Sequence, residues 1–194
     1  MKRTITLLMG VCLLPLAGVT LAQQVSQPSF TNQDISAYHG DNNTLVNAIA
    51  VIEQSAAGKV IDIRFASTNG TPGYNVVLVK GAQVQFFHFQ EHSKQVVELD
   101  ASSKPTYMLN WRGKADVHFA LTAQVSLSTA IQTAEQAHPG APAMAAGIAR
   151  SASNPESDVH AYNVLLKRGG SVKRVAIDSA TGEEIADPSA LSSF

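Results

Sequence analysis

Asp178 is the first residue whose type and spacing suggest chemistry, because it stands close to Thr181-Gly182. An acid beside Thr-Gly is typical of aspartic proteases, where the three residues are contiguous and the carboxylate shares a proton with a twin. Here two residues intervene. That spacing instead favours a turn in which Asp178 accepts backbone amides and Gly182 supplies a positive φ. We therefore predict that Asp178, Thr181 and Gly182 are structural.

Histidines are the next candidates, as ligands of a metal ion. His88 and His92 have the i, i+4 spacing that suits a metal site on a helix. The sequence around His88 is typical of a strand, however, where that spacing separates two residues by roughly 13 Å. No His-Glu-x-x-His motif occurs. We predict no functional metal site among the six histidines, which are His39, His88, His92, His118, His138 and His160.

The sequence also lacks a nucleophile in a catalytic setting. Its one cysteine, Cys12, lies near the N-terminus, and no serine stands in a Gly-x-Ser-x-Gly elbow. Gly169-Gly170-Ser171 is too short for a phosphate-binding loop, which needs a lysine and a following helix. We predict that the protein is not an enzyme and needs no cofactor.

Aromatic residues are candidates for contact with a partner. Trp111 and Arg112 fall in a stretch that we expect to be a loop, and a tryptophan beside an arginine is typical of an interface anchor. The other interpretation is that Trp111 covers a junction between two structural units. Tyr74 and Tyr162 occupy equivalent places in a repeated segment. We expect them to pack inside a sheet, with partner contact as the alternative.

The N-terminus predicts export from the cell. A basic start is followed by a short apolar run from Ile5 to Leu14 and by small residues up to Ala22, an order typical of a secretory signal peptide. We predict cleavage after Ala22, release to the periplasm or the outside, and no membrane span in the mature chain. Without Lys2 and Arg3 the 14 basic residues become 12, against 15 acidic ones. The mature chain would therefore be slightly acidic. Nothing in this balance suggests a nucleic-acid binder, because such proteins carry clustered positive charge.

The elements that position these residues occur twice. Tyr74-Asn75-Val76-Val77-Leu78 returns 88 positions later as Tyr162-Asn163-Val164-Leu165-Leu166. Ala48-Ile49 returns 82 positions later as Ala130-Ile131. A shared register over many positions indicates an internal repeat of one supersecondary unit.

Each copy predicts one helix and a short antiparallel meander. Asp41 to Thr44 supply caps for a helix that ends at Gly58, and Ser126 or Ser128 caps one that ends at His138-Pro139-Gly140. Strands are expected at residues 60–65, 74–80, 84–89, 96–99, 117–125, 141–149, 160–166 and 172–177. Alternation in the first strand places Ile61, Ile63 and Phe65 on one face and Asp62 and Arg64 on the other.

The predicted fold class is therefore α+β, with two repeated units, each one helix packed on a short antiparallel β-meander sheet. The predicted division of the chain is a signal peptide at 1–22, an N-terminal lead-in at 23–43, a first unit at 44–104, a linker and lead-in strand at 105–125, and a second unit at 126–188.

The second copy resembles the PepSY domain. Its helix has the form Ala-Ile-x-x-Ala-Glu closing in Pro-Gly, followed by Tyr-x-Val-x-Leu and by Asp-x-x-Thr-Gly-Glu. In the first copy Gln90 stands where Asp178 stands, and Ser93-Lys94-Gln95 where Thr181-Gly182-Glu183 stand. The residues that carry the resemblance are Ala130, Ile131, Ala134, Glu135, Pro139, Gly140, Tyr162, Val164, Leu166, Asp178, Thr181, Gly182 and Glu183.

The resemblance implies an envelope or secreted location, a small α+β fold and a non-catalytic role. Domains of this kind occur in propeptides of secreted metalloproteases and as free-standing envelope proteins. We therefore predict a PepSY-like protein that binds an unidentified envelope protein or enzyme and modulates it, with inhibition as one form. The alternative is a periplasmic protein that binds a small ligand or a metal ion at the junction of the two units.

Overall fold

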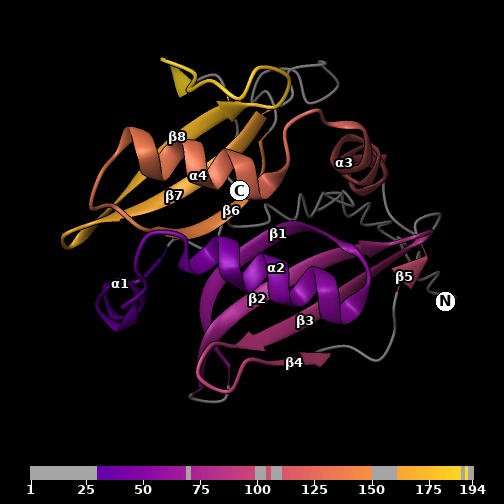
Figure 1. Cartoon of the computed structure of the whole chain (residues 1–194), viewed down its shortest axis with the longest axis horizontal. Coiled ribbons are helices and arrows are strands. Elements are labelled where there is room, and N and C mark those ends of the chain that lie inside the picture. Colours follow the sequence, from indigo (N-terminus) through magenta and orange to yellow (C-terminus); the bar gives the residue numbers. More distant parts are fainter. Residues whose placement is uncertain are drawn as a thin grey trace, which may run out of the picture.

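The computed structural model describes residues 30–68, 71–98, 104–105, 111–149, 161–188 and 191. The predicted signal peptide lies outside them. No helix in the described ranges is long and apolar enough to cross a membrane. These ranges form four helices and eight strands (Figure 1), which in chain order are α1 Asn32–Ala37, α2 Thr44–Ala56, β1 Lys59–Thr68, β2 Thr71–Lys80, β3 Gln83–Gln90, β4 Gln95–Glu98, β5 Lys104–Pro105, α3 Trp111–Thr122, α4 Leu127–Ala137, β6 Ala143–Ala149, β7 Ala161–Arg168 and β8 Ser171–Asp178.

The strands form one continuous antiparallel sheet in the order β4-β3-β2-β1-β6-β7-β8, with β5 pairing β3. The two halves of the sheet join where β1 pairs β6 at Asp62↔Gly147, Ile63↔Ala146 and Arg64↔Ala145. The prediction of two repeated units, each with its own helix and meander sheet, is therefore wrong. A separate meander has two edges with unpaired backbone groups, and joining β1 to β6 removes one edge from each half.

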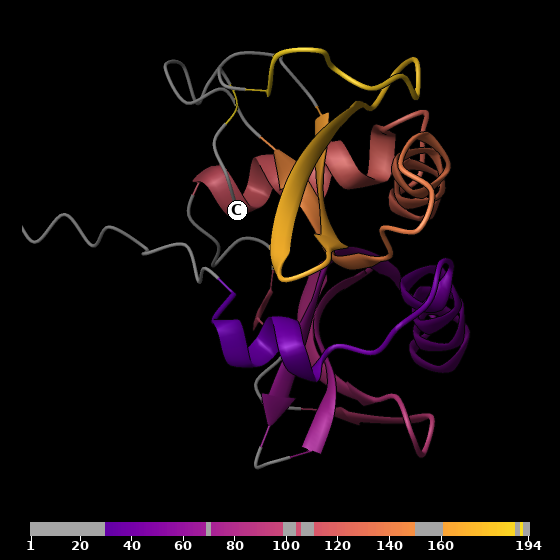
Figure 2. The same ribbon diagram turned by 90° about the vertical axis from the view of Figure 1, so that its left-hand side faces the viewer.

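One face of this sheet is covered by α2 and α4, which contact each other and lie on the same side in Figure 2. We call this the helix face and the opposite one the rear face. A single apolar core under the two helices contains residues from both halves, such as Ile49 and Leu78 from the first and Ile131 and Leu166 from the second. The two helices thus stabilise one shared core.

The lead-in and the linker both form helices, at opposite ends of the sheet (Figure 1). Thr31 caps α1 in a capping box with Asp34. The predicted strand at 117–125 is wrong, because Trp111–Thr122 is the helix α3. Val117, Phe119 and Ala120 are buried while Leu121 is exposed. Phe119 joins the core under the two helices, whereas Val117 and Ala120 join a separate apolar cluster with Ile61.

The helices of the core begin in different ways. Ser126 caps α4 as predicted, because Thr129 N donates to its Oγ at 3.1 Å. Asn43 precedes α2 in a left-handed conformation, and no side chain caps that helix. The capping prediction for α2 is therefore wrong. The Asn43 amide instead donates to Glu135 Oε2 at 2.7 Å, so α4 fixes the start of α2.

Candidate functional site

The structure places Asp178 at the end of β8, at the start of a tight turn. Ala180 N and Thr181 N both donate to Asp178 Oδ1 at 2.8 Å, and Gly182 follows at φ 77°. The hydrogen bond from Thr181 N, followed by the one from Ala180 N, lowers the pKa of the Asp178 carboxyl. This carboxylate is thus engaged by the backbone of its own turn.

Both repeated tyrosines are buried among aromatic rings of the core. Tyr74 lies between Phe65 and Phe89, with ring centroids 6.0 and 6.4 Å away. Tyr162 lies 5.4 Å from the ring of Phe119, and its hydroxyl donates to Val125 O at 3.0 Å. Neither ring is exposed enough to contact a partner, so their surroundings fit a packing role.

The other predicted residues are scattered. Trp111 and Arg112 form the first turn of α3 rather than a loop, and their side chains lie outside the described part of the structure. His160 also lies outside it. Within the described ranges no three acidic, histidine or cysteine residues gather as metal ligands. His88 is buried in β3, where its Nδ1 lies 2.9 Å from Asn75 Oδ1.

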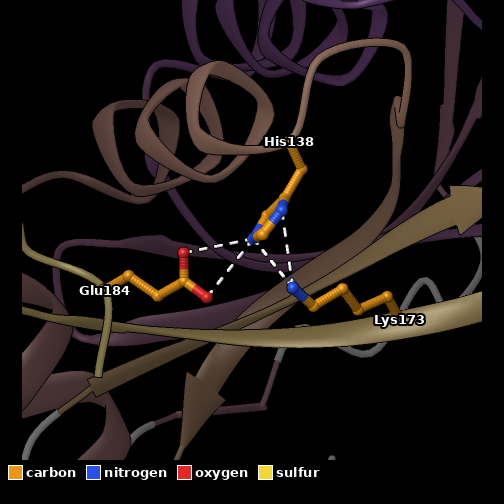
Figure 3. Close-up of polar contacts among 3 residues, drawn as sticks. All are labelled: His138, Lys173 and Glu184. Atoms are coloured by element: carbon orange, nitrogen blue, oxygen red, sulfur yellow. Dashed lines mark hydrogen bonds and ion pairs between the residues drawn. The ribbon is translucent and has the colours of Figure 1, made fainter. Parts of the chain in front are cut away.

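A polar cluster closes the end of α4 against β8. His138 Nε2 lies 3.1 Å from Glu184 Oε2 and 3.1 Å from Lys173 Nζ, so the three side chains converge in Figure 3. The His138 and Glu184 side chains are partly exposed, at 22% and 33%. Neither hollow described below is lined by these three residues, and their exposure fits a surface link between elements.

The candidate site is a groove on the rear face, at the junction of the two halves. It measures about 280 Å³ and is bounded by α3, the first three strands and β6. Six of its lining residues in the described ranges are apolar and two are carboxylates. They are Ile61, Asp62, Val77, Val84, Phe86, Asp116, Val117 and Ile148.

A β-bulge in β1 shapes this groove. Val60 pairs with Leu78 and Asp62 with Val77, so Ile61 is the extra residue. The bulge places Ile61 in the rear-face cluster with Val84 and Val117, whereas Ile63 lies in the core of the helix face. The prediction that Ile61 and Ile63 share a face is therefore wrong, and the bulge brings Ile61 and Asp62 to the same groove.

Asp62 carries the unusual electrostatics of the site. Burial raises its pKa to about 6, because the charged form loses hydration. Arg64 on the same strand favours the charged form, and Asp116 on α3 opposes it. A perturbed carboxyl in a cleft is the kind of group found at functional sites. The groove combines apolar walls with two carboxylates, an arrangement that fits the binding of a group with both apolar and polar parts.

A second hollow of about 630 Å³ lies near the end of α1, the start of β2 and the turn after β3. Its lining mixes charges of both signs, including Glu91 and Lys94, with the exposed His39 and His92. The smaller groove is therefore the better candidate, because it combines apolar walls with a perturbed carboxyl.

Sequence reasoning missed this groove. Alternation correctly separated Asp62 and Arg64 from Ile63 and Phe65, but it gave no sign that α3 covers the rear face. The available signal was the helical spacing of Val117 and Ala120, which both join the rear-face cluster with Ile61.

Comparison with known proteins supports the resemblance found in the sequence. Residues 124–187 match the PepSY family, described as "Peptidase propeptide and YPEB domain". The match covers α4 and β6 to β8, so the second half of the sheet is the part that resembles this family. The PepSY resemblance is thus confirmed for this region. A comparison with curated proteins gave no match.

Among solved structures, the chain is similar to a "putative lipoprotein" from Clostridium difficile 630. The two sequences are 14% identical, and the alignment covers 76% of this chain and 93% of that one, with a TM-score of 0.43. A superposition this loose does not indicate a shared function.

Proposed function

We propose that this protein is a non-catalytic PepSY-like protein of the cell envelope that binds another envelope protein and modulates its activity. The observation that carries the proposal is the groove at the junction of the halves. It has apolar walls and two carboxylates, and its volume of about 280 Å³ suits one side chain of a partner. Sites for drug-sized ligands run from about 300 to 1,000 Å³.

The position of α3 supports this proposal. Trp111 and Arg112 stand in its first turn, and Asp116 and Val117 of the same helix line the groove. Interface anchors are enriched in tryptophan and arginine, and they cluster around desolvated pockets. A partner that covers α3 would thus contact both the predicted anchor residues and the groove.

The PepSY match supports the same class of function. The family description names a domain of peptidase propeptides, which are segments of enzymes. Inhibition of an envelope enzyme is the form of modulation that we propose. The alternative, a small-ligand protein, has support from the same groove, so the experiment below includes it as an outcome.

The test is capture from the envelope fraction of the cells that produce the protein. Wild-type protein is immobilised beside Val77→Arg, which fills the groove, and Val97→Arg, which places the same side chain at an exposed site in β4. We expect one dominant protein on the wild type and on Val97→Arg, and its loss on Val77→Arg. The activity of the captured protein is then measured with and without the wild-type protein that retained it.

Two outcomes would overturn the proposal. One is a column that retains no protein, combined with a ligand-dependent rise of the melting temperature in a metabolite screen. The other is equal retention by all three columns. If Val77→Arg does not fold, Val77→Met fills the groove without adding charge, and the same comparison is made with Val97→Met.

A further inference from the structure

The charge of Asp62 is compensated only in part, because desolvation outweighs the attraction of Arg64. No hydrogen bond or ion pair joins its carboxylate to another residue within the ranges that the structure describes. Arg64 and Asp116 act on it with opposite signs, and desolvation outweighs both. A cation that enters the groove would therefore stabilise the charged form of this carboxylate, which the apolar walls leave poorly hydrated.

The carboxylates that line the groove come from two elements, Asp62 from β1 and Asp116 from α3. Arg64, also on β1, attracts the charge of Asp62. The lining contributed by β2, β3 and β6 in the described part of the chain is apolar, namely Val77, Val84, Phe86 and Ile148. The groove is therefore acidic at the junction of β1 and α3 and apolar along its other walls.

This combination matches the chemistry of a long basic side chain. Lysine and arginine carry three or four methylene groups that pack on apolar surface, and a charged head that needs a polar or acidic partner. An aliphatic or aromatic side chain would fill the volume but leave the charge of Asp62 only partly compensated. An anionic side chain would be repelled by both carboxylates.

We propose that the groove binds a single lysine or arginine side chain of the partner protein. Its ammonium or guanidinium lies against Asp62 and Asp116, and its methylene stem lies against Val77, Val84 and Phe86. This inference rests on the proposed function, since it names the chemistry of the partner at the same site. The groove then acts as a specificity pocket, because a neutral side chain of equal length binds less well.

The test uses short peptides as probes of that chemistry. Acetyl-Gly-Gly-Arg-Gly-Gly-amide, and its Lys, Met and Glu analogues, are titrated at pH 7.5 into the isotope-labelled protein while amide resonances are recorded. We expect millimolar binding of the Arg and Lys peptides, with shifts confined to β1, β2, β3 and α3. The Met peptide should bind at least about fivefold more weakly, and the Glu peptide should not bind.

Asparagine variants locate the binding charge. Asp62→Asn and Asp116→Asn should each weaken the Arg peptide about fivefold. Asp41→Asn removes the same charge at an exposed site and should change nothing. Affinity for the Arg peptide should fall as the pH drops from 7.5 to 5, and this decline should disappear in Asp62→Asn.

Several results would overturn the inference. They are equal binding of the Met and Arg peptides, shifts far from the groove, or equal affinity in Asp62→Asn and wild type. Binding of n-butylammonium as tight as that of the Lys peptide would assign the groove to a small free cation instead. If an envelope protein is captured equally by wild type and Asp62→Asn, this inference fails while the proposed function stands. If the Arg peptide binds but no protein is captured, the proposed function fails.

Discussion

The turns that follow β3 and β8 stand 88 positions apart in the sequence and are built from different side chains. After β8, Asp178 accepts two backbone amides and Gly182 takes the left-handed conformation, at φ 77°. After β3, Gln90 stands in the place of Asp178, and Ser93 Oγ donates to its Oε1 at 2.9 Å. Lys94 takes the left-handed place at φ 55°. The first turn thus has a left-handed residue at the equivalent position without the glycine that favours it.

A second difference lies at the helices. Glu135 of α4 is 3% exposed and accepts two amides, from Asn43 at 2.7 Å and from Ala143 at 2.8 Å. Glu53 of α2 is partly buried and accepts one, from Val60 at 2.9 Å. The second half thus holds both its own strand and the start of the other helix. The family match begins at residue 124 and follows this better supported half.

Replacing these two glutamates gives the largest expected contrast. Glu135→Ala leaves two amides without their acceptor, so we expect the free energy of unfolding to fall by about 3 to 5 kcal/mol. Glu53→Ala removes one bond and should cost about 1 to 2 kcal/mol. Urea denaturation of the two variants measures both values. Equal losses would contradict the view that Glu135 links the two halves.

Asp62 and Asp178 should give opposite pH dependences of stability. The raised pKa of Asp62, about 6, means that the folded state binds a proton more readily than the unfolded state. Its contribution therefore stabilises the fold increasingly as the pH falls from about 7 to 4. The pKa of Asp178 is lower in the folded state than in the unfolded state. Its contribution to stability is therefore fully present above the unfolded-state pKa and is lost as the pH falls through the folded-state pKa.

Asparagine variants separate the two effects. Asp62→Asn should stabilise the protein by about 1 to 3 kcal/mol at pH 7.5, and this gain should vanish near pH 4. Asp178→Asn should destabilise it near neutral pH, with a loss that shrinks in acid. Thermal denaturation across this range gives the measurement. A pH-independent effect of Asp62→Asn would show that its carboxyl has an ordinary pKa.

Much of the sheet follows from local sequence. The pairs β2–β3 and β7–β8 were predicted because alternating apolar residues flank short turns, at Gly81 and at Gly169-Gly170. The helices α2 and α4 were predicted because apolar residues recur with helical spacing. These signals lie within a few residues of each other, so no knowledge of distant contacts was needed.

The joining of the halves and the groove could not be predicted in this way. The pairing of β1 with β6 rests on Asp62, Ile63 and Arg64 opposite a run of alanine and glycine, which has no strong strand preference. The bulge at Ile61 changes the face of a residue without a local signal in its type. The groove also needs α3, whose second half lies where the sequence predicts a strand at 117–125. Its acidic lining depends on contacts between residues more than 50 positions apart.

Substitutions of the left-handed residues in the two turns should change stability by smaller amounts and in opposite directions. Gly182→Ala places a Cβ at φ 77°, which should cost about 1 to 2 kcal/mol, since its nearest neighbour would be Val125 Cγ2 at an ordinary 3.5 Å. Lys94→Gly relieves the same strain at φ 55° and should stabilise by about 0.5 to 1 kcal/mol. Lys94→Ala, which removes the lysine side chain and its contact with the Phe89 ring but keeps the strained φ, is the control. A loss of stability in Lys94→Gly would contradict the comparison.

The smallest expected contrast concerns the two repeated tyrosines. The hydroxyl of Tyr162 donates to Val125 O, so Tyr162→Phe should cost about 1 kcal/mol. The hydroxyl of Tyr74 is buried and makes no hydrogen bond of good geometry within the described ranges, although the side chains of Tyr38 and Glu91 lie near it. Tyr74→Phe should therefore leave stability unchanged or raise it by up to about 1 kcal/mol, because a phenyl ring needs no partner. Urea denaturation decides the sign. If both variants lose equal stability, the Tyr74 hydroxyl is hydrogen-bonded in solution, and the two halves use their repeated tyrosine in the same way.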